Sequence, residues 1–207
     1  MCVGLGTGST AYFAIKKLGE RVQQGLKIQA VATSLATEKL AKEENIPLIP
    51  LSDVDSLDMT IDGADEFDPN LNLVKGGGGA LFREKLIASL SNELIIITDA
   101  RKEVPVLGAF PLPVEIVVFG WEITQRRIQK MGAKATVRMN GNEPFLTDNG
   151  NYILDCEFGP IHDPAELHIS LIQLVGVVET GLFIGMTSMV IVGNEQGESK
   201  IFNAKNQ

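Results

Sequence analysis

The stretch DGADEFDPNLNLVKGGGGALFRE, residues 62–84, decides how this chain is interpreted, because it places carboxylates, a lysine and four consecutive glycines between two apolar segments. A run of glycines such as Gly76–Gly79 costs backbone entropy when it becomes ordered. Such a run is favoured where the backbone must lie directly against a ligand. Lys75 stands directly before them. Asp62 and Asp65 directly follow an apolar run with the length of a strand, where α/β folds deliver polar groups to the carboxyl edge of the sheet. The stretch therefore predicts a reaction site.

Strands and helices alternate on both sides of this stretch. Residues 2–6 and 28–32 are typical of short strands, and a helical pattern follows each of them, the second with Ser34 as N-cap. After the glycines, a helix is expected to bury Phe82, Leu86 and Leu90 along one stripe, and residues 93–98 indicate a central strand. This alternation predicts an α/β fold with a Rossmann-like, doubly wound and mostly parallel sheet.

A different rhythm follows Pro111 and Pro113. The expected elements are a strand at 114–119, a helix at 122–131, strands at 134–139, 145–147 and 152–158, a helix and a strand at 180–184. Asn149-Gly150 is a favoured pair for the positive-φ positions of a tight hairpin, and Asp163-Pro164 is typical of a helix start. The order β-α-β-β-α-β predicts a second, smaller ferredoxin-like α+β domain.

Three segments follow from these patterns. We expect a Rossmann-like catalytic domain at 1–110, a ferredoxin-like domain at 111–185, and a segment 186–207 that returns to the first sheet. The strands of that last segment are predicted at 189–192 and 200–203.

Composition excludes several classes of function. With 207 residues, 44% of them hydrophobic, the chain is long enough to bury a substantial core. A formal net charge of −8 without a basic cluster argues against a nucleic-acid partner. No apolar run has the length of a membrane span, and no signal peptide is evident. Because Cys2 and Cys156 make a disulfide framework improbable, we expect a cytoplasmic protein.

The segment Gly4-Leu5-Gly6-Thr7-Gly8-Ser9-Thr10 combines a flexible backbone with three hydroxyls at a predicted helix N-terminus, where an anion such as phosphate is favoured. It is not a dinucleotide fingerprint, since Ser9 occupies the place of the third glycine and the next strand lacks the expected acid. It is not a Walker loop either, because no lysine precedes Ser9. The alternative is a glycine-rich turn without a ligand.

The acidic residues that follow have simpler interpretations as turn caps or as a solvated loop. The functional interpretation gains from their combination with Lys75, since carboxylates and an ammonium beside one ligand supply proton donors, acceptors and a countercharge. Glu84, near the first turn of the following helix and off the expected apolar stripe, is either an exposed acid or a group directed at the loop. Lys102 follows the strand that ends at Asp99 and is either a residue that reaches the same edge or an ordinary surface lysine. His162 and His168 lack metal-ligand spacing, and no metal site is predicted.

The motifs GLGTGST, DGADE, KGGGGALFREK, FPLPVE and TDNGN, in this order, resemble the type A ribose-5-phosphate isomerase family over nearly the whole chain. The resemblance implies interconversion of D-ribose 5-phosphate and D-ribulose 5-phosphate without metal or organic cofactor. The implied partner is a small sugar phosphate, and the implied assembly is a homodimer or homotetramer. A non-catalytic sugar-phosphate-binding protein and an acyl or CoA transferase are the alternatives.

The same resemblance implies a role for individual residues. Glu84 matches the catalytic base, and Asp62, Asp65 and Lys75 match catalytic residues that assist it. The implied substrate-binding residues are Thr7, Gly8, Ser9, Thr10, Gly63, Ala64, Gly76, Gly77, Gly78 and Lys102. Members of the family begin with a helix before the first strand, whereas this chain starts almost inside that strand. We expect either a truncated sequence or a lineage without this helix, with weaker affinity for phosphate.

Overall fold

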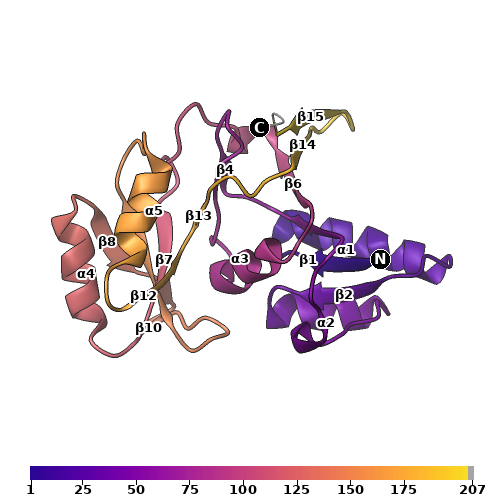
Figure 1. The fold of residues 1–207 in the computed structure, drawn as a ribbon, viewed down its shortest axis with the longest axis horizontal. Helices are drawn as coiled ribbons and strands as arrows, with labels where there is room; N and C mark the ends of the chain where they lie inside the picture. Colours follow the sequence, from indigo (N-terminus) through magenta and orange to yellow (C-terminus); the bar gives the residue numbers. More distant parts are fainter. Residues whose placement is uncertain (205–207) are drawn as a thin grey trace. The chain divides into compact units, whose positions relative to one another are not determined.

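The computed structural model describes residues 1–204 (Figure 1). The chain forms two compact units, each built from separate stretches of sequence. The first unit contains residues 1–64, 83–101 and the chain from Met186 onward, and the second contains residues 65–82 and 102–185. The expected domains 1–110, 111–185 and 186–207 remain a prediction, and residues 205–207 of the last lie outside the described part.

The first unit holds a six-stranded sheet in the order β15-β14-β6-β3-β1-β2. Its strands are β1 (Cys2–Leu5), β2 (Gln29–Ala32), β3 (Met59–Asp62), β6 (Leu94–Asp99), β14 (Met189–Gly193) and β15 (Ser199–Asn203). All neighbours are parallel except β14 and β15, which form an antiparallel pair at one edge. The predicted doubly wound sheet and its two returning strands are therefore confirmed.

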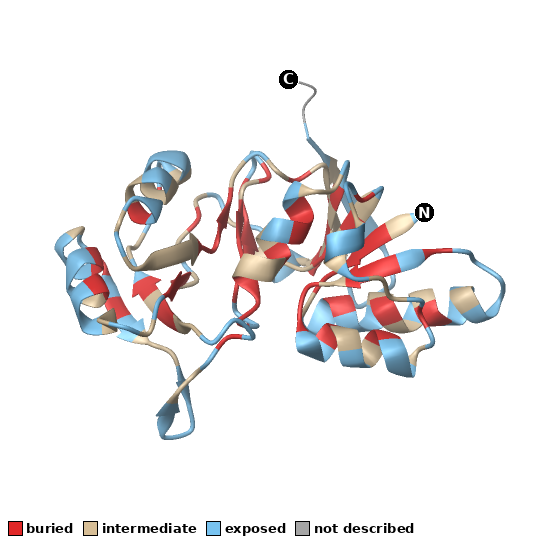
Figure 2. Ribbon diagram, turned by 60° about the horizontal axis from the view of Figure 1, so that its bottom comes forward, coloured by how far each residue is buried: buried red, intermediate tan, exposed pale blue. Residues whose placement is uncertain are grey.

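Helices cover both faces of this sheet. On one face, α1 (Ser9–Gln23) and α2 (Leu35–Glu43) bury Ile15 and Ala41 against Val3 and other strand residues. On the other face, α3 (Leu81–Ser89) contributes Ile87 to a cluster with Val31 and Leu57. Figure 2 shows the buried residues following the strands and one side of each helix. As predicted, Ser34 caps α2, since its hydroxyl accepts the N–H of Thr37 at 3.0 Å.

The predicted apolar stripe of α3 is wrong at Leu86, whereas Leu90 packs against the buried cluster of the sheet, as predicted. Leu86 is 41% exposed, while Leu81, Glu84, Ile87 and Ala88 are buried. The spacing i, i+3, i+6, i+7 fits a helix as well as the predicted spacing of four does, so periodicity alone did not select the face. The consequence is that Glu84 lies on the buried side of its helix and is not the exposed acid of the simpler interpretation.

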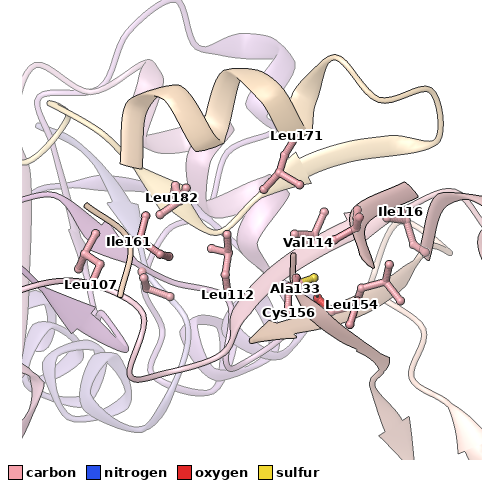
Figure 3. Close-up of a cluster of buried hydrophobic side chains, with 13 residues drawn as sticks. Leu107, Leu112, Val114, Ile116, Ala133, Leu154, Cys156, Ile161, Leu171 and Leu182 are labelled. Atoms are coloured by element: carbon pink, nitrogen blue, oxygen red, sulfur yellow. Dashed lines mark hydrogen bonds between the residues drawn. The ribbon is translucent and has the colours of Figure 1, made fainter. Parts of the chain in front are cut away.

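The second unit contains the predicted ferredoxin-like arrangement. Its elements are β7 (Leu112–Ile116), α4 (Trp121–Lys130), β8 (Lys134–Val137), β11 (Tyr152–Glu157), α5 (Pro164–Ile172) and β12 (Val177–Thr180). The sheet has the order β12-β7-β11-β8 with antiparallel neighbours. Figure 3 shows the core between this sheet and its helices, where Val114, Leu154 and Leu171 are fully buried. Asp163 caps α5 as predicted, accepting the N–H of Glu166 at 2.9 Å.

Three predicted details of this unit are wrong. The strand expected at 114–119 is shifted toward the N-terminus and ends before Phe119, which is 94% exposed. The strand expected at 145–147 is absent, and a short hairpin of β9 (Met139–Asn140) and β10 (Glu143–Pro144) precedes that segment. In the turn that follows, only Gly150 has a positive φ, 75°, so Asn149 does not share the mirror-image turn geometry that the pair suggested.

A third, three-stranded sheet in the second unit was not predicted. It consists of β4 (Glu66–Phe67), β5 (Leu73–Val74) and β13 (Leu182–Phe183), in the order β13-β5-β4. These strands are only two residues long, too short to produce a recognisable alternation of apolar and polar residues. Two short 3-10 helices, η1 (Leu51–Asp53) and η2 (Ala100–Lys102), complete the described elements.

Candidate active site

The first loop, Gly6–Thr10, connects β1 to α1 in the first unit. Gly8 precedes the helix with φ 108° and ψ 177°, a conformation that residues with a side chain rarely adopt. Tyr12 makes the first backbone hydrogen bond of the helix, to the carbonyl of Gly8 at 3.0 Å. The N–H groups of Ser9 and Thr10 therefore precede the helical ladder, and both residues are exposed. This is the geometry in which a helix N-terminus binds an anion.

The side chain of Thr7 has a different surrounding from its neighbours in the loop. Its hydroxyl lies 2.7 Å from that of Thr33, 2.8 Å from that of Ser34 and 3.1 Å from that of Thr37. Thr37 in turn donates to the carbonyl of Gly6 at 2.8 Å. This hydroxyl cluster ties the first loop to the start of α2. The hydroxyl of Thr7 is thus held within the protein, and the substrate contact predicted for this residue remains a prediction.

Asp62 fixes the first loop from the neighbouring strand. Its side chain is buried, and Oδ1 accepts the N–H groups of Thr7 at 3.1 Å and of Gly63 at 2.8 Å. The contact requires glycine at position 6, because a Cβ there would lie 2.1 Å from Oδ1 and 2.5 Å from the Cα of Asp62. The end of β3 and the first loop are therefore packed tightly together and hydrogen-bonded to each other.

Two cavities of the first unit border the first loop. Thr7 and Gly8 line a cavity of about 270 Å³ beside α2. Ser9 and Thr10 line a larger one of about 660 Å³, together with Arg101 and other residues at the carboxyl ends of β6 and β14. Arg101 donates through Nε to Asp99 at 2.9 Å, and this hydrogen bond raises the pKa of the guanidinium. The larger cavity thus places Arg101 beside the exposed hydroxyls of the loop, with its charge balanced by the Asp99 carboxylate, and Glu195 also lines this cavity.

Glu84 lies in the first turn of α3, and its side chain is only 4% exposed. Burial disfavours a carboxylate unless the surroundings compensate for the lost hydration. Such an environment is common for groups that exchange protons during a reaction and rare for a surface acid. The placement of Glu84 directly after the glycines thus favours a functional role over a role as a helix-terminal charge.

In the second unit, the acidic residues after β3 bond to backbone N–H groups and do not form a solvated loop. Asp65 accepts the N–H of Gly77 at 2.7 Å. Glu66 is buried and accepts the N–H groups of Gly108 at 2.7 Å and Phe110 at 2.5 Å. Asp68 is also buried and accepts two N–H groups of its own turn. Glu66 and Asp68 are therefore structural, which leaves Asp65 as the acid directed at the glycines.

Lys75 directly follows β5 and is buried, with 2% of its surface exposed. Its N–H donates to the carbonyl of Gly181 at 2.9 Å, and its Nζ lies 5.4 Å from the ring centroid of Phe183. Gly76 and Gly79 then adopt positive φ angles of 108° and 80°. We call Gly76–Gly79 the glycine loop. Within this loop, the N–H of Gly79 donates a hydrogen bond to the carbonyl of Gly76 at 3.0 Å, which forms a tight turn.

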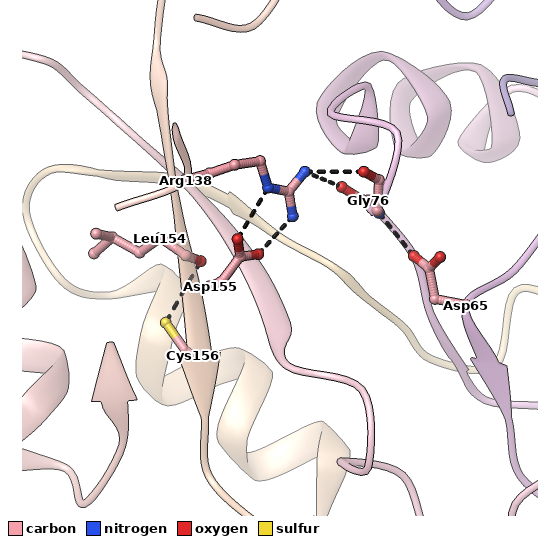
Figure 4. A network of polar contacts seen from close by, with 7 residues as sticks. Asp65, Gly76, Arg138, Leu154, Asp155 and Cys156 are labelled. Atoms are coloured by element: carbon pink, nitrogen blue, oxygen red, sulfur yellow. Dashed lines mark hydrogen bonds and ion pairs between the residues drawn. The ribbon is translucent and has the colours of Figure 1, made fainter. Parts of the chain in front are cut away.

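Sequence reasoning missed Arg138, which follows β8. Its Nη1 donates to the carbonyls of Gly76 at 2.7 Å and Gly77 at 3.2 Å. Its Nε and Nη2 donate to the two carboxylate oxygens of Asp155 on β11, at 3.0 and 2.5 Å (Figure 4). The sequence did contain a signal for the Arg138–Asp155 pair. Arg138 lies on one predicted strand, Asp155 lies on another, and the ferredoxin-like order makes these two strands neighbours.

The predicted residues divide between the two units. The first unit brings together Thr7, Asp62 and Gly63, and the second brings together Asp65 and Gly77. The first unit also holds Gly8, Ser9 and Thr10, and the second also holds Lys75, Gly76 and Gly78. Three further predicted residues lie close in sequence to the points where the chain passes from one unit to the other: Ala64, Glu84 and Lys102, the last half-buried in η2.

Metal-binding side chains do not gather in this region. Among residues 1–204, no group of three or more His, Cys, Asp or Glu side chains is arranged to hold a metal ion. In that same part of the chain, each helix is too short or too polar to cross a membrane. Cys2 and Cys156 are both free thiols, and burial raises the pKa of Cys156 to about 12.

Comparison with known proteins places the chain in one family. Residues 29–197 match the family ribose 5-phosphate isomerase A (phosphoriboisomerase A). The ribose-5-phosphate isomerase A of Bacillus mycoides is 57% identical over 198 residues, which are 95% of this chain and 90% of that protein.

Solved structures agree with this match. The ribose 5-phosphate isomerase of Plasmodium falciparum is 40% identical, with a TM-score of 0.96 over 100% of this chain and 92% of that one. A D-ribose-5-phosphate isomerase in complex with phospho-erythronic acid is 41% identical, with a TM-score of 0.94 over 98% of this chain and 90% of that one. The chain therefore belongs to the ribose 5-phosphate isomerase A family.

Proposed function

We propose that this chain interconverts D-ribose 5-phosphate and D-ribulose 5-phosphate, with Glu84 as the general base. The observation that carries the residue assignment is the burial of Glu84 in the first turn of α3, directly after the glycine loop, in a chain of this family. Membership of the family supports the reaction, and the geometry within each unit supports the roles of individual residues.

The chemistry requires one proton to move between neighbouring carbons. Removal of the proton from C2 of the open-chain aldose gives an enediolate, and return of a proton at C1 gives the ketose. One carboxylate can perform both transfers, because it holds the proton between the two steps. The burial of Glu84 suits this task, because it separates the carboxylate from water that would exchange the proton, and its place directly after the glycine loop distinguishes it from the other buried acids.

The other residues bind the sugar phosphate or stabilise charge. Ser9 and Thr10 present N–H and hydroxyl groups at the start of α1 for the phosphate. The other proposed substrate contacts come from Thr7, Gly8, Gly63, Ala64, Gly76, Gly77, Gly78 and Lys102. Lys75 would stabilise the negative oxygen of the enediolate, and a buried ammonium does so more strongly than an exposed one.

Asp62 and Asp65 are proposed to assist ring opening and the transfer of hydroxyl protons. Each uses a carboxylate oxygen to hold backbone, Oδ1 in Asp62 and Oδ2 in Asp65. In Asp65 the oxygen proposed to meet a sugar hydroxyl is Oδ1. The complex of a relative with phospho-erythronic acid supports this chemistry, because the carboxylate of that compound has two oxygens on one planar carbon, as an enediolate has two on neighbouring planar carbons.

The test is conversion of ribose 5-phosphate by Glu84→Gln, followed as ketose formation in the presence of a metal chelator. We expect kcat to fall at least about 100-fold with a modest change in KM, because the amide has the shape of the acid but cannot accept a proton. Glu122→Gln is the matched control, since Glu122 occupies the first turn of α4 but is exposed. Near-normal turnover of Glu84→Gln would remove it from the mechanism, and binding without turnover in the unaltered chain would indicate a sugar-phosphate-binding protein.

We also infer a homo-oligomer, a homodimer or a homotetramer, in the cytoplasm. Large apolar side chains are exposed on the second unit, with Phe119 94% and Val175 81% accessible, which is unusual for a surface that stays in water. Light scattering of the purified chain distinguishes these states from a monomer.

A further inference from the structure

The peptide unit between Gly76 and Gly77 is held from both sides. Its carbonyl oxygen accepts Nη1 of Arg138 at 2.7 Å, and its N–H donates to Oδ2 of Asp65 at 2.7 Å. In a trans peptide the carbonyl and the N–H point in opposite directions. Arg138 and Asp65 therefore lie on opposite sides of the same peptide, as Figure 4 shows. Rotation of this peptide would break both bonds.

Glycine makes such an external hold necessary. Gly76–Gly79 has no side chain to restrict its dihedral angles, so the loop loses more backbone entropy on ordering than other sequences do. Only one backbone hydrogen bond within it, from Gly79 to Gly76, is among those described. A peptide flip at Gly76–Gly77 would leave the chain path nearly unchanged but would turn the N–H away from Asp65.

Arg138 is itself held firmly enough to act as a support. Its side chain is 15% exposed, and two of its nitrogens form a fork on Asp155, which is 30% exposed. A bidentate pair of this kind fixes the plane of the guanidinium, and the outer edge of that plane is what meets the glycine carbonyls. Its backbone is fixed too, since its N–H donates to the carbonyl of Ile153 at 2.8 Å.

A second contact comes from the same hairpin. Phe145, whose N–H donates to the carbonyl of Arg138 at 2.8 Å, places its ring beside Gly79. A Cβ on Gly79 would lie 2.5 Å from the ring. The segment that contains β9 and β10 thus contacts the glycine loop at both ends, once through a charge and once through an aromatic ring.

We propose that Arg138, oriented by Asp155, is a positioning residue of the isomerase: it fixes the Gly76–Gly77 peptide and thereby aims the Asp65 carboxylate and the loop N–H groups at the substrate. The inference rests on the proposed function, because it concerns the geometry needed for that reaction. Arg138 is not proposed to touch the substrate. It acts through the peptide that it holds.

The consequence for the reaction is a loss of alignment and not of binding groups. Without Arg138, Asp65 keeps its charge but loses the fixed donor that orients it, and the carbonyls of the glycine loop are free to turn. A misplacement of about 1 Å in a catalytic group costs on the order of 100-fold in rate. We therefore expect kcat to fall about 10- to 100-fold in Arg138→Met, while KM changes less than about threefold.

The experiment measures kcat, KM and the thermal midpoint for the unaltered chain, Arg138→Met, Arg138→Lys, Asp65→Ala and the double variant Arg138→Met with Asp65→Ala. Lysine keeps the charge but has no fork to bridge Asp155 and the two carbonyls, so Arg138→Lys should resemble Arg138→Met. If Arg138 acts through Asp65, Arg138→Met should lower kcat by less than about threefold in the Asp65→Ala background.

The matched control is Lys134→Met. Lys134 and Glu157 form an exposed ion pair on the same two strands, at 2.9 Å, without a contact to the glycine loop. This variant should keep the kcat of the unaltered chain. Asp155→Asn removes the negative charge of Asp155 but keeps an oxygen that can accept a hydrogen bond from Arg138. We expect a kcat between those of the unaltered chain and Arg138→Met.

Three results would overturn the inference. The first is an unchanged kcat in a folded Arg138→Met. The second is a full, multiplicative loss in the double variant. The third is a loss of kcat in Asp155→Asn and Arg138→Lys that merely follows the fraction unfolded. Absence of turnover in the unaltered chain would instead remove the proposed function, and the inference with it.

Discussion

The first loop and the glycine loop are both rich in glycine, yet they are held in different ways. In the first loop, Asp62 accepts the N–H of Thr7, and hydroxyls from the next βα unit complete the support. In the glycine loop, Asp65 accepts the N–H of Gly77, but the opposite side depends on Arg138, which lies 62 positions along the chain from Gly76. One loop is supported by neighbouring elements of a common motif, the other by a distant part of the sequence.

This difference explains what each loop tolerates. A support made of strand ends and a helix start has little freedom, because the backbone itself is the framework. A support made of one guanidinium and one ring can be removed without unfolding the sheet that carries it. Changes in the first loop should therefore affect stability and activity together, while changes around the glycine loop should affect mainly activity.

The largest effect is expected from Gly6→Ala. The new Cβ would lie 2.5 Å from the Cα of Asp62, which is backbone and cannot move away cheaply. Overpacking of this kind costs about 1–3 kcal/mol, and we expect a loss of kcat/KM of at least about 100-fold because Asp62 is displaced. Thermal unfolding and kinetics measure both.

The control for Gly6→Ala is Gly193→Ala. Gly193 lies at the end of β14 in the same sheet, and a Cβ there would meet no atom within 4 Å. Its thermal midpoint should equal that of the unaltered chain. A Gly6→Ala variant with unchanged stability would show that the first loop is no more rigid than the glycine loop.

A smaller effect is expected from Gly79→Ala. This residue has a φ of 80°, and its Cβ would lie 2.5 Å from the ring of Phe145. We expect kcat to fall about 10-fold, with a cost in stability of about 1–2 kcal/mol from the left-handed backbone. Adding Phe145→Ala should recover most of the kcat, because the clash is removed while the strain remains.

The informative outcome is the double variant. If Phe145→Ala leaves the kcat of Gly79→Ala unchanged, the clash with the ring is not the cause of the loss, and the strained backbone alone explains it. Recovery of kcat without recovery of stability would separate the two effects, as expected for a loop held from a distance.

The smallest effect concerns the core beneath Arg138. Cys156 follows Asp155 on β11, and burial, reinforced by the Asp155 charge, raises the pKa of its thiol from 9.0 to about 12. Between these values the folded state binds more protons than the unfolded state, so its stability falls as the pH rises above 9.0 and is unaffected below it. The slope reaches about 1.4 kcal/mol per pH unit.

Denaturant unfolding of the unaltered chain and of Cys156→Ala measures this effect. The stability advantage of the unaltered chain should shrink by about 1 kcal/mol between about pH 8 and about pH 10. A constant difference would mean that water reaches the thiol, and that the core of β11 is a less rigid base for Arg138 than its burial implies.

The contrast between the loops also shows which features could be predicted from the sequence and which could not. Local chemistry was readable: the capping of α2 by Ser34, the start of α5 at Asp163-Pro164 and the strand at 94–99 all follow from neighbouring residues. The ferredoxin-like order was predicted for the same reason, since it depends on the succession of elements and not on their contacts.

What depended on distant contacts was missed. Leu86 resembles a core residue by periodicity, but the face that α3 buries is set by its tertiary packing. The burial of Glu66 depends on N–H groups at 108 and 110, and the three-stranded sheet joins residues near 66 to residues near 183. Arg138 belongs to the same category, because no local pattern connects an arginine after β8 with a glycine run far upstream.

The largest sheet of the molecule is also completed last during synthesis. Strand β6 pairs with β14, Ile95 beside Met189, so a growing chain on the ribosome carries β6 with one edge open until β14 emerges. An apolar strand with an open edge is a template for wrong pairing, and pairing over so long a separation is slow. The growing chain is therefore most vulnerable to aggregation in the interval between the synthesis of β6 and that of β14.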